Sequence, residues 1–163
     1  MNDFDDVTAS VQTRRDFCVR TCQAVSLLTL GAVIPACGGS STSPTNSAPA
    51  LPTVGGSLAG RTLTITVATG SPLANVGGAA MVSASTGTYL VARTSQSAVT
   101  AVTAVCTHEG CAVTGFDSGH YVCPCHGSTF TTSGTVVQGP ASSPLRQFPA
   151  TFDAASNVVT ISV

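Results

Sequence analysis

The chain has 163 residues, of which 8% are charged and 43% hydrophobic, and its formal net charge at pH 7 is −1. All six basic residues are arginines, and three residues of each sign follow Cys37. A nearly neutral surface without a basic stripe argues against nucleic-acid binding and against strong electrostatic steering of a charged partner. We therefore expect a partner to dock through mostly apolar contacts.

The amino-terminal residues have the features of an export signal. Arg14 and Arg15, within Thr13–Phe17, resemble the twin-arginine motif and precede an apolar stretch at 24–36. As a helix, thirteen residues reach only about 20 Å, which is short of the roughly 30 Å hydrocarbon core of a membrane. We predict that residues 1–36 are a twin-arginine signal peptide, which places the mature protein in the periplasm or on the extracytoplasmic face of a bacterial membrane.

A short linker is expected after the signal. The segment Ile34–Gly39 resembles a bacterial lipobox, in which Cys37 would receive a lipid and anchor the protein to the membrane. An unmodified Cys37 near an ordinary cleavage site is the alternative. Residues 37–52 are rich in Ser, Thr, Pro and Gly, a composition typical of a flexible tether or of a simple spacer.

Residues 53–163 have the length of one domain, and their pattern is that of strands. Apolar and polar residues alternate at 61–67, 98–105 and 157–163, and shorter runs at 79–83 and 88–93 are bounded by glycine or polar turns. No window shows a convincing helical face with capping residues. We predict an all-β fold of stacked antiparallel sheets, with a smaller subdomain at one end.

Two short boxes of cysteine and histidine stand within this domain. The ligand-type residues of the boxes are Cys106, His108, Cys111, Cys123, Cys125 and His126. Each box offers one sulfur and one imidazole at short spacing, so two facing loops would enclose a flat pair of irons. A tetrahedral zinc is the alternative, although common zinc frameworks pair Cys with Cys and His with His along the chain.

From about Val105 to Leu145 the sequence closely resembles the Rieske iron–sulfur family, and Gly139, Pro140 and Ala141 fit the family's proline loop. The resemblance implies a [2Fe–2S] cluster and a Rieske-like antiparallel β-sandwich with a small cluster-binding subdomain. Histidine in place of cysteine on one iron raises the reduction potential. The implied roles are Cys106 and Cys123 on the inner iron, His108 and His126 on the outer iron, and a disulfide between Cys111 and Cys125.

Several residues near the boxes bear on the reduction potential. Ser128 stands where the family places a hydroxyl that hydrogen-bonds a bridging sulfide, and Phe130 stands where high-potential members carry a tyrosine. The missing phenol predicts a midpoint below the top of the Rieske range, which is about +300 mV. Glu109, Asp117 and His120 are expected to be solvated. Four glycines are expected to let backbone N–H groups approach the cluster sulfurs: Gly110, Gly115, Gly119 and Gly127.

These features predict one-electron transfer in an exported, membrane-associated or periplasmic redox chain. The chain would be an electron-transfer protein by itself and a subunit or partner of an oxidoreductase. Its partner would be the quinol of a cytochrome bc-like complex, bound at His108 or His126, or a redox protein such as a cytochrome or a molybdenum enzyme resembling arsenite oxidase. A zinc-stabilised binding module without redox work is the third hypothesis. An oxidising compartment suits both the export signal and a disulfide.

Overall fold

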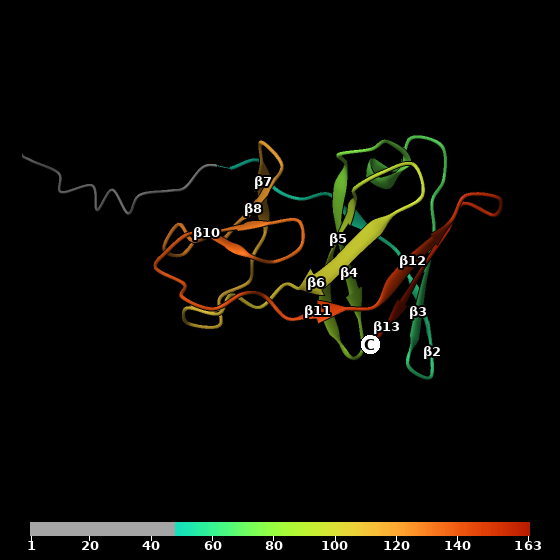
Figure 1. Ribbon diagram of the computed structural model, residues 1–163. Coiled ribbons are helices and arrows are strands. Elements are labelled where there is room, and N and C mark those ends of the chain that lie inside the picture. The colour runs from blue at the N-terminus through green and yellow to red at the C-terminus, as the bar shows by residue number, and fades with distance from the viewer. Residues whose placement is uncertain (1–47) are drawn as a thin grey trace, which may run out of the picture. The chain divides into compact units, whose positions relative to one another are not determined.

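The structure is a computed structural model, in which residues 48–163 are described (Figure 1). Arg14, Arg15 and Cys37, and most of the linker predicted at 37–52, lie outside the described residues. No helix among residues 48–163 is long and apolar enough to cross a membrane.

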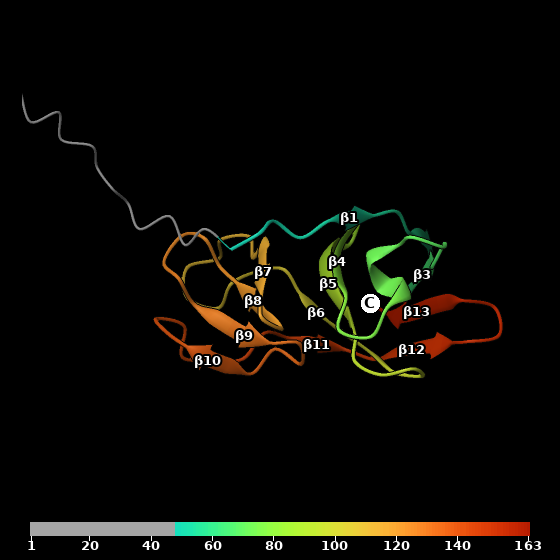
Figure 2. The same ribbon diagram turned by 90° about the horizontal axis from the view of Figure 1, so that it is seen from above.

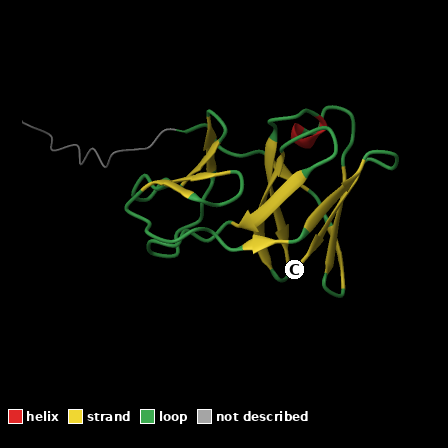
Figure 3. Cartoon of the chain, viewed as in Figure 1, coloured by secondary structure: helices red, strands yellow, loops and turns green. Residues whose placement is uncertain are grey.

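Three sheets make up the described residues (Figures 1 and 3). The central sheet has the strand order β1 (Thr53–Val54), β4 (Ala79–Ala84), β5 (Gly87–Arg93), β6 (Val99–Thr103) and β11 (Gln147–Phe148). The outer sheet has the order β12 (Ala150–Asp153), β13 (Val158–Ser162), β3 (Thr62–Thr66) and β2 (Ser57–Ala59). The small sheet has the order β10 (Val136–Gln138), β9 (Thr129–Thr131), β8 (His120–Val122) and β7 (Gly115–Asp117).

The all-β prediction is confirmed. Strands β3, β4, β5, β6 and β13 fall within one or two residues of the five predicted runs. The one helix among the described residues is the 3₁₀ turn η1 (Pro72–Ala74), which Ser71 caps by accepting the Leu73 N–H at 3.3 Å. The sheets are antiparallel except for the two-residue pairing of β1 with β4, which is parallel. Strands of two or three residues, such as β7 to β10, are too short to show a period in the sequence.

The central sheet is buried on both faces. Along β5, Tyr89 and Val91 point into the core shared with the outer sheet, whereas Leu90 and Ala92 point into a second core shared with the small sheet. Because successive strand residues face opposite sides, a strand between two cores is apolar throughout and shows no alternation. The central sheet therefore joins the β-sandwich to the small sheet on its other side (Figure 2).

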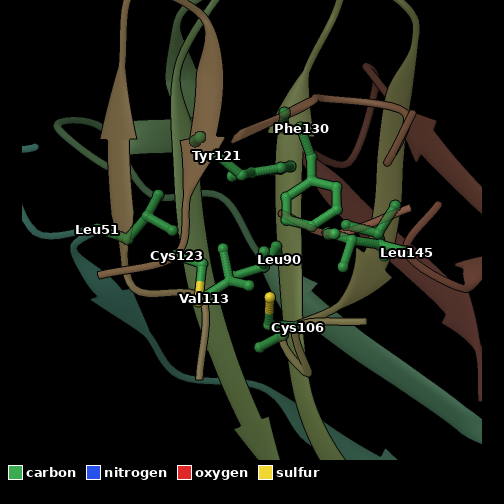
Figure 4. Packing of buried hydrophobic residues seen from close by; sticks show 13 residues of the cluster. Leu51, Leu90, Cys106, Val113, Tyr121, Cys123, Phe130 and Leu145 are labelled. Carbon is green, nitrogen blue, oxygen red and sulfur yellow. The ribbon is translucent and has the colours of Figure 1, made fainter. Parts of the chain in front are cut away.

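The second core is the one that reaches the two cysteine–histidine boxes. It packs Leu90 and Val102 of the central sheet against Tyr121 and Phe130 of the small sheet, all of them fully buried. The remaining members named in Figure 4 are Leu51, Cys106, Val113, Cys123 and Leu145. Hydrophobic burial against a sheet that is itself held on both faces fixes the position of the loops that follow.

The first described residues pair with the small sheet. Leu51 N–H donates to the Thr114 carbonyl at 2.7 Å, and Phe116 N–H donates to the Pro49 carbonyl at 2.9 Å. Residues 48–52, which composition assigns to the linker, therefore belong to the fold. Gly115 makes this contact possible, because a Cβ there would lie 2.9 Å from the Ala48 Cβ and 3.1 Å from the Val122 Cβ.

Gly115→Ala should lower the free energy of unfolding by about 1–3 kcal/mol, since the added methyl group overpacks the space between Ala48 and Val122. Gly55→Ala is the matched control, because a Cβ at Gly55 meets nothing within 4 Å. Its effect should stay within about 0.5 kcal/mol. Urea unfolding of both variants measures the difference, and equal midpoints would contradict the packing argument.

Candidate metal centre

The two boxes lie in two loops with the same backbone arrangement. The first loop joins β6 to β7, and the second joins β8 to β9. Gly110 N–H donates to the Cys106 carbonyl at 2.9 Å, and Gly127 N–H donates to the Cys123 carbonyl at 3.0 Å. Both glycines adopt positive φ, 75° and 78°, which a side chain would disfavour. Each loop thus makes one tight turn after its cysteine, with a histidine inside that turn.

The thiols of Cys106 and Cys123 are buried, with 2% and 1% of each residue exposed. Figure 4 shows both sulfur atoms at one edge of the second core, with Tyr121 and Phe130 on its far side. Burial raises the pKa of the Cys123 thiol, whereas backbone hydrogen bonds from Cys125 and His126 lower it, and a hydrogen bond with the Cys106 thiol raises it. Two sulfurs therefore lie side by side, and N–H groups already point at one of them.

The imidazoles of His108 and His126 face each other at the surface. Their Nδ1 atoms are 3.2 Å apart, and their ring planes meet at 88°. The side chains are 28% and 45% exposed. The Nε2 atoms point away from this pair toward Glu109, whose two carboxylate oxygens lie 3.9 Å from Nε2 of His108 and 3.8 Å from Nε2 of His126.

This geometry separates a two-iron centre from a single zinc. The four ligand atoms of a tetrahedral zinc lie about 3–4 Å from one another, given Zn–S and Zn–N bonds of about 2.0–2.3 Å. Within residues 48–163, the groups of three such atoms that fit inside 4.8 Å are His108 with Glu109 and His126, and Cys123 with Cys111 and Cys125. Neither group joins a thiol to an imidazole. A sulfur end and a nitrogen end, each with two donors, fit the two metals of a [2Fe–2S] cluster.

A disulfide joins the two loops. Cys111 and Cys125 are bonded, with Cα atoms 6.6 Å apart and a sequence separation of 14 residues. The expected pairing is therefore confirmed, and Cys106 and Cys123 are the free thiols among the described residues. The bond holds the loops together independently of any bound metal.

The proline loop contacts both boxes through side chains. Thr107 Oγ1 donates to the Ser143 carbonyl at 2.6 Å, and Ala141 N–H donates to Ser128 Oγ at 3.0 Å. Ser128 is completely buried, and its own hydroxyl proton stays available to donate a second hydrogen bond. Ser128 and the loop at 139–141 are thus in direct contact, and the hydrogen bond from Ser128 to a bridging sulfide stays a prediction.

Two aromatic residues form the inner wall of the site. Phe130 is fully buried in the same core as the two thiols. Tyr121 is also fully buried, its hydroxyl has no hydrogen-bond partner among the described residues, and burial raises the pKa of that phenol. Tyr121 is not among the residues that the sequence predicted to lie at the site. Its place two residues before Cys123 on a strand is the signal, since residues i and i+2 share a face.

Some residues expected near the cluster lie elsewhere. Gly115 is in β7 against Ala48, and Gly119 lies in the turn between β7 and β8, so neither brings backbone N–H groups to the thiols. Asp117 and His120 pair across the turn end of the β7–β8 hairpin, which is the end away from Cys123. Glu109, expected to be merely solvated, is exposed but lies across both imidazoles.

Replacing both disulfide cysteines, Cys111→Ala with Cys125→Ala, should lower the free energy of unfolding by about 2–4 kcal/mol, because a cross-link closing a loop of this length restricts the unfolded chain. Guanidinium unfolding with and without dithiothreitol measures the effect. Reductant should shift wild type toward the double variant and leave the double variant unchanged. An equal shift of both proteins would contradict the stated role of the disulfide.

Comparisons with known proteins point to one family. The sequence pattern of the Rieske [2Fe-2S] domain matches residues 66–149. The cytochrome b6-f complex iron-sulfur subunit of Chlorobaculum thiosulfatiphilum is 42% identical over 64 residues, which are 39% of this chain and 35% of that protein. The same subunit from Prochlorococcus marinus (strain AS9601) is 58% identical over 40 residues, 23% of this chain and 22% of that protein.

A solved structure is also similar in part. The cyanobacterial plasma membrane Rieske protein PetC3 from Synechocystis PCC 6803 is 30% identical, with a TM-score of 0.47, and the match covers 52% of this chain and 86% of that chain. The chain spans about a third or less of the b6-f subunits that it matches. The family pattern itself covers more than half of the 163 residues and includes both boxes. The chain therefore belongs to the Rieske [2Fe-2S] domain family.

Proposed function

We propose that this chain carries one electron at a time through a Rieske [2Fe–2S] cluster. Cys106 and Cys123 would hold the inner iron, and His108 and His126 the outer iron. The observation that carries the proposal is the pairing of two buried thiols with two partly exposed imidazoles on loops joined by a disulfide. When bound, the cluster supplies a pair of irons that takes up and releases a single electron.

The protein's own residues would stabilise and shield this electron. Backbone N–H groups of Cys125 and His126 donate to the Cys123 sulfur and favour its negative charge. The buried Ser128 hydroxyl and the proline loop close the space beside the second box. Because these dipoles are held by the core and the disulfide, little reorganisation accompanies the change in charge.

The imidazoles would be the route by which the electron enters and leaves. Their Nε2 atoms face outward, whereas the thiols are covered by protein. A partner that docks over His108 and His126 would bring its own redox centre closest to the outer iron.

The relatives favour one kind of partner over the other. Several are iron-sulfur subunits of cytochrome b6-f complexes, which supports a place for this chain in a membrane-associated redox complex of that kind. The motif at Arg14 and Arg15, the lipobox cysteine Cys37 and the Cys111–Cys125 disulfide together support an exported, lipid-anchored protein in an oxidising compartment.

Potentiometric titration of the purified full chain tests the proposed function. We expect a single one-electron wave with a midpoint within the Rieske range of about −150 to +300 mV. His108→Ala and His126→Ala should lose this wave, whereas His120→Ala should keep it, because His120 lies on β8 beside Asp117. A two-electron wave, or a wave that survives loss of both His108 and His126, would refute the proposal.

Phe130→Tyr should raise the midpoint by roughly 40–90 mV, because a phenol hydrogen bond worth about 1–2 kcal/mol would favour the reduced state. Phe130 is fully buried in the core that contains both thiols, so the added hydroxyl enters that same core. Redox titration of wild type and variant measures the shift. Tyr89→Phe, in the other core, is the matched control and should leave the midpoint unchanged; no upward shift in Phe130→Tyr would contradict the tuning role.

A further inference from the structure

Charge is unevenly divided between the two ends of the described residues. The segment 104–145, which contains both boxes and the small sheet, carries two acids, Glu109 and Asp117, and no arginine or lysine. The three arginines among residues 48–163 lie outside this segment: Arg61, Arg93 and Arg146. Arg93 is 7% exposed, with its guanidinium over the Phe152 ring, and Arg146, which directly follows the segment, holds its guanidinium over the Phe148 ring of β11. The end of the molecule through which the electron passes is therefore acidic, although the chain as a whole is nearly neutral.

Glu109 is the acid at the centre of that end. It is 62% exposed, and each of its two carboxylate oxygens lies within 4 Å of a different Nε2, that of His108 and that of His126. The carboxylate thus lies across the outward edges of both imidazoles. A partner that contacts both imidazoles at these edges therefore comes close to this negative charge.

We propose that Glu109 makes the imidazole surface selective for a positively charged redox protein, one with lysine or arginine side chains around its exposed redox centre. This inference rests on the proposed function and names the partner class. A cationic group would pair with the carboxylate, whereas an anionic group beside the partner's centre would be repelled at the point of closest approach. The near-zero total charge keeps long-range steering weak, so the selectivity acts within about one Debye length.

The electron balance of the step is simple. The cluster, when bound, would supply one electron, and the partner's metal would be reduced by one unit, with no bond made or broken. Small outer-sphere oxidants can replace the partner in a test. Tris(phenanthroline)cobalt(III), with charge +3, and ferricyanide, with charge −3, each accept one electron and differ in the sign of their charge.

Stopped-flow oxidation of the dithionite-reduced full chain by each oxidant tests the proposal. At about 10 mM ionic strength, Glu109→Gln should slow oxidation by the cobalt complex about 3- to 10-fold and speed oxidation by ferricyanide by a similar factor. At about 1 M salt both effects should fall below about 2-fold. Rates are compared after the measured midpoint of each variant is used to correct for driving force.

Two variants serve as controls. Asp117→Asn removes the same charge from the same segment, but at the turn end of the β7–β8 hairpin away from Cys123, and should change either rate by less than about 2-fold. Glu109→Asp keeps the charge and should keep most of the selectivity. Glu109→Ser repeats the test if Glu109→Gln fails to bind its cluster. An unchanged ratio of the two rates in the neutral Glu109 variants, or an equal change in Asp117→Asn, overturns the proposal.

An equilibrium readout needs no electron transfer. Oxidised chain and an oxidised cytochrome c of high isoelectric point are mixed in a calorimeter, and the dissociation constant should rise about 3- to 10-fold in Glu109→Gln at about 10 mM ionic strength. Equal binding by wild type and Glu109→Gln counts against the proposal. Failure of the proposed function is distinguishable from failure of this inference. A chain without a redox-active cluster would not be oxidised by either the cobalt complex or ferricyanide.

Discussion

The site depends on holding two thiols inside a hydrophobic core while histidines two and three residues away reach the surface. Cys106 and Cys123 are buried against Leu90 and Val102 of a sheet that is itself packed on both faces. A tight turn with a glycine at positive φ follows each cysteine and sends the histidine outward. The site thereby has a buried end, which holds the sulfur donors, and a solvent-exposed end, which holds the nitrogen donors.

This separation has a direct electrostatic consequence. At the buried end, burial raises the pKa of the Cys123 thiol, and the N–H groups of Cys125 and His126 oppose that shift. These dipoles act strongly because water is excluded around them. At the solvent-exposed end, the Nε2 atoms of His108 and His126 lie within 4 Å of the Glu109 carboxylate. In this account the buried end stabilises the electron and the solvent-exposed end selects the partner. The Cys111–Cys125 disulfide holds together the two loops that form both ends.

The sequence was informative where the chemistry is local. The spacing of Cys106, His108, Cys123 and His126 predicted the site, and period-two alternation located β3 and β13. It was less informative for contacts between distant segments. The pairing of residues 48–51 with the small sheet depends on space left by Gly115, and the position of Glu109 over His126 depends on how two loops meet, so neither could be predicted from neighbours in the sequence. Tyr121 lies on a strand of three residues, too short to show its period, so its place two residues before Cys123 was the one local signal for it.

The most direct test of the central claim is electron paramagnetic resonance combined with electron–nuclear double resonance. The sample is the dithionite-reduced protein labelled with 15N-histidine. We predict two irons per chain, one unpaired electron per chain, and coupling of that electron to nitrogen nuclei of two histidines, His108 and His126. Replacing either histidine should remove one coupling or the signal itself. A colourless, magnetically silent protein with one zinc per chain would contradict the account.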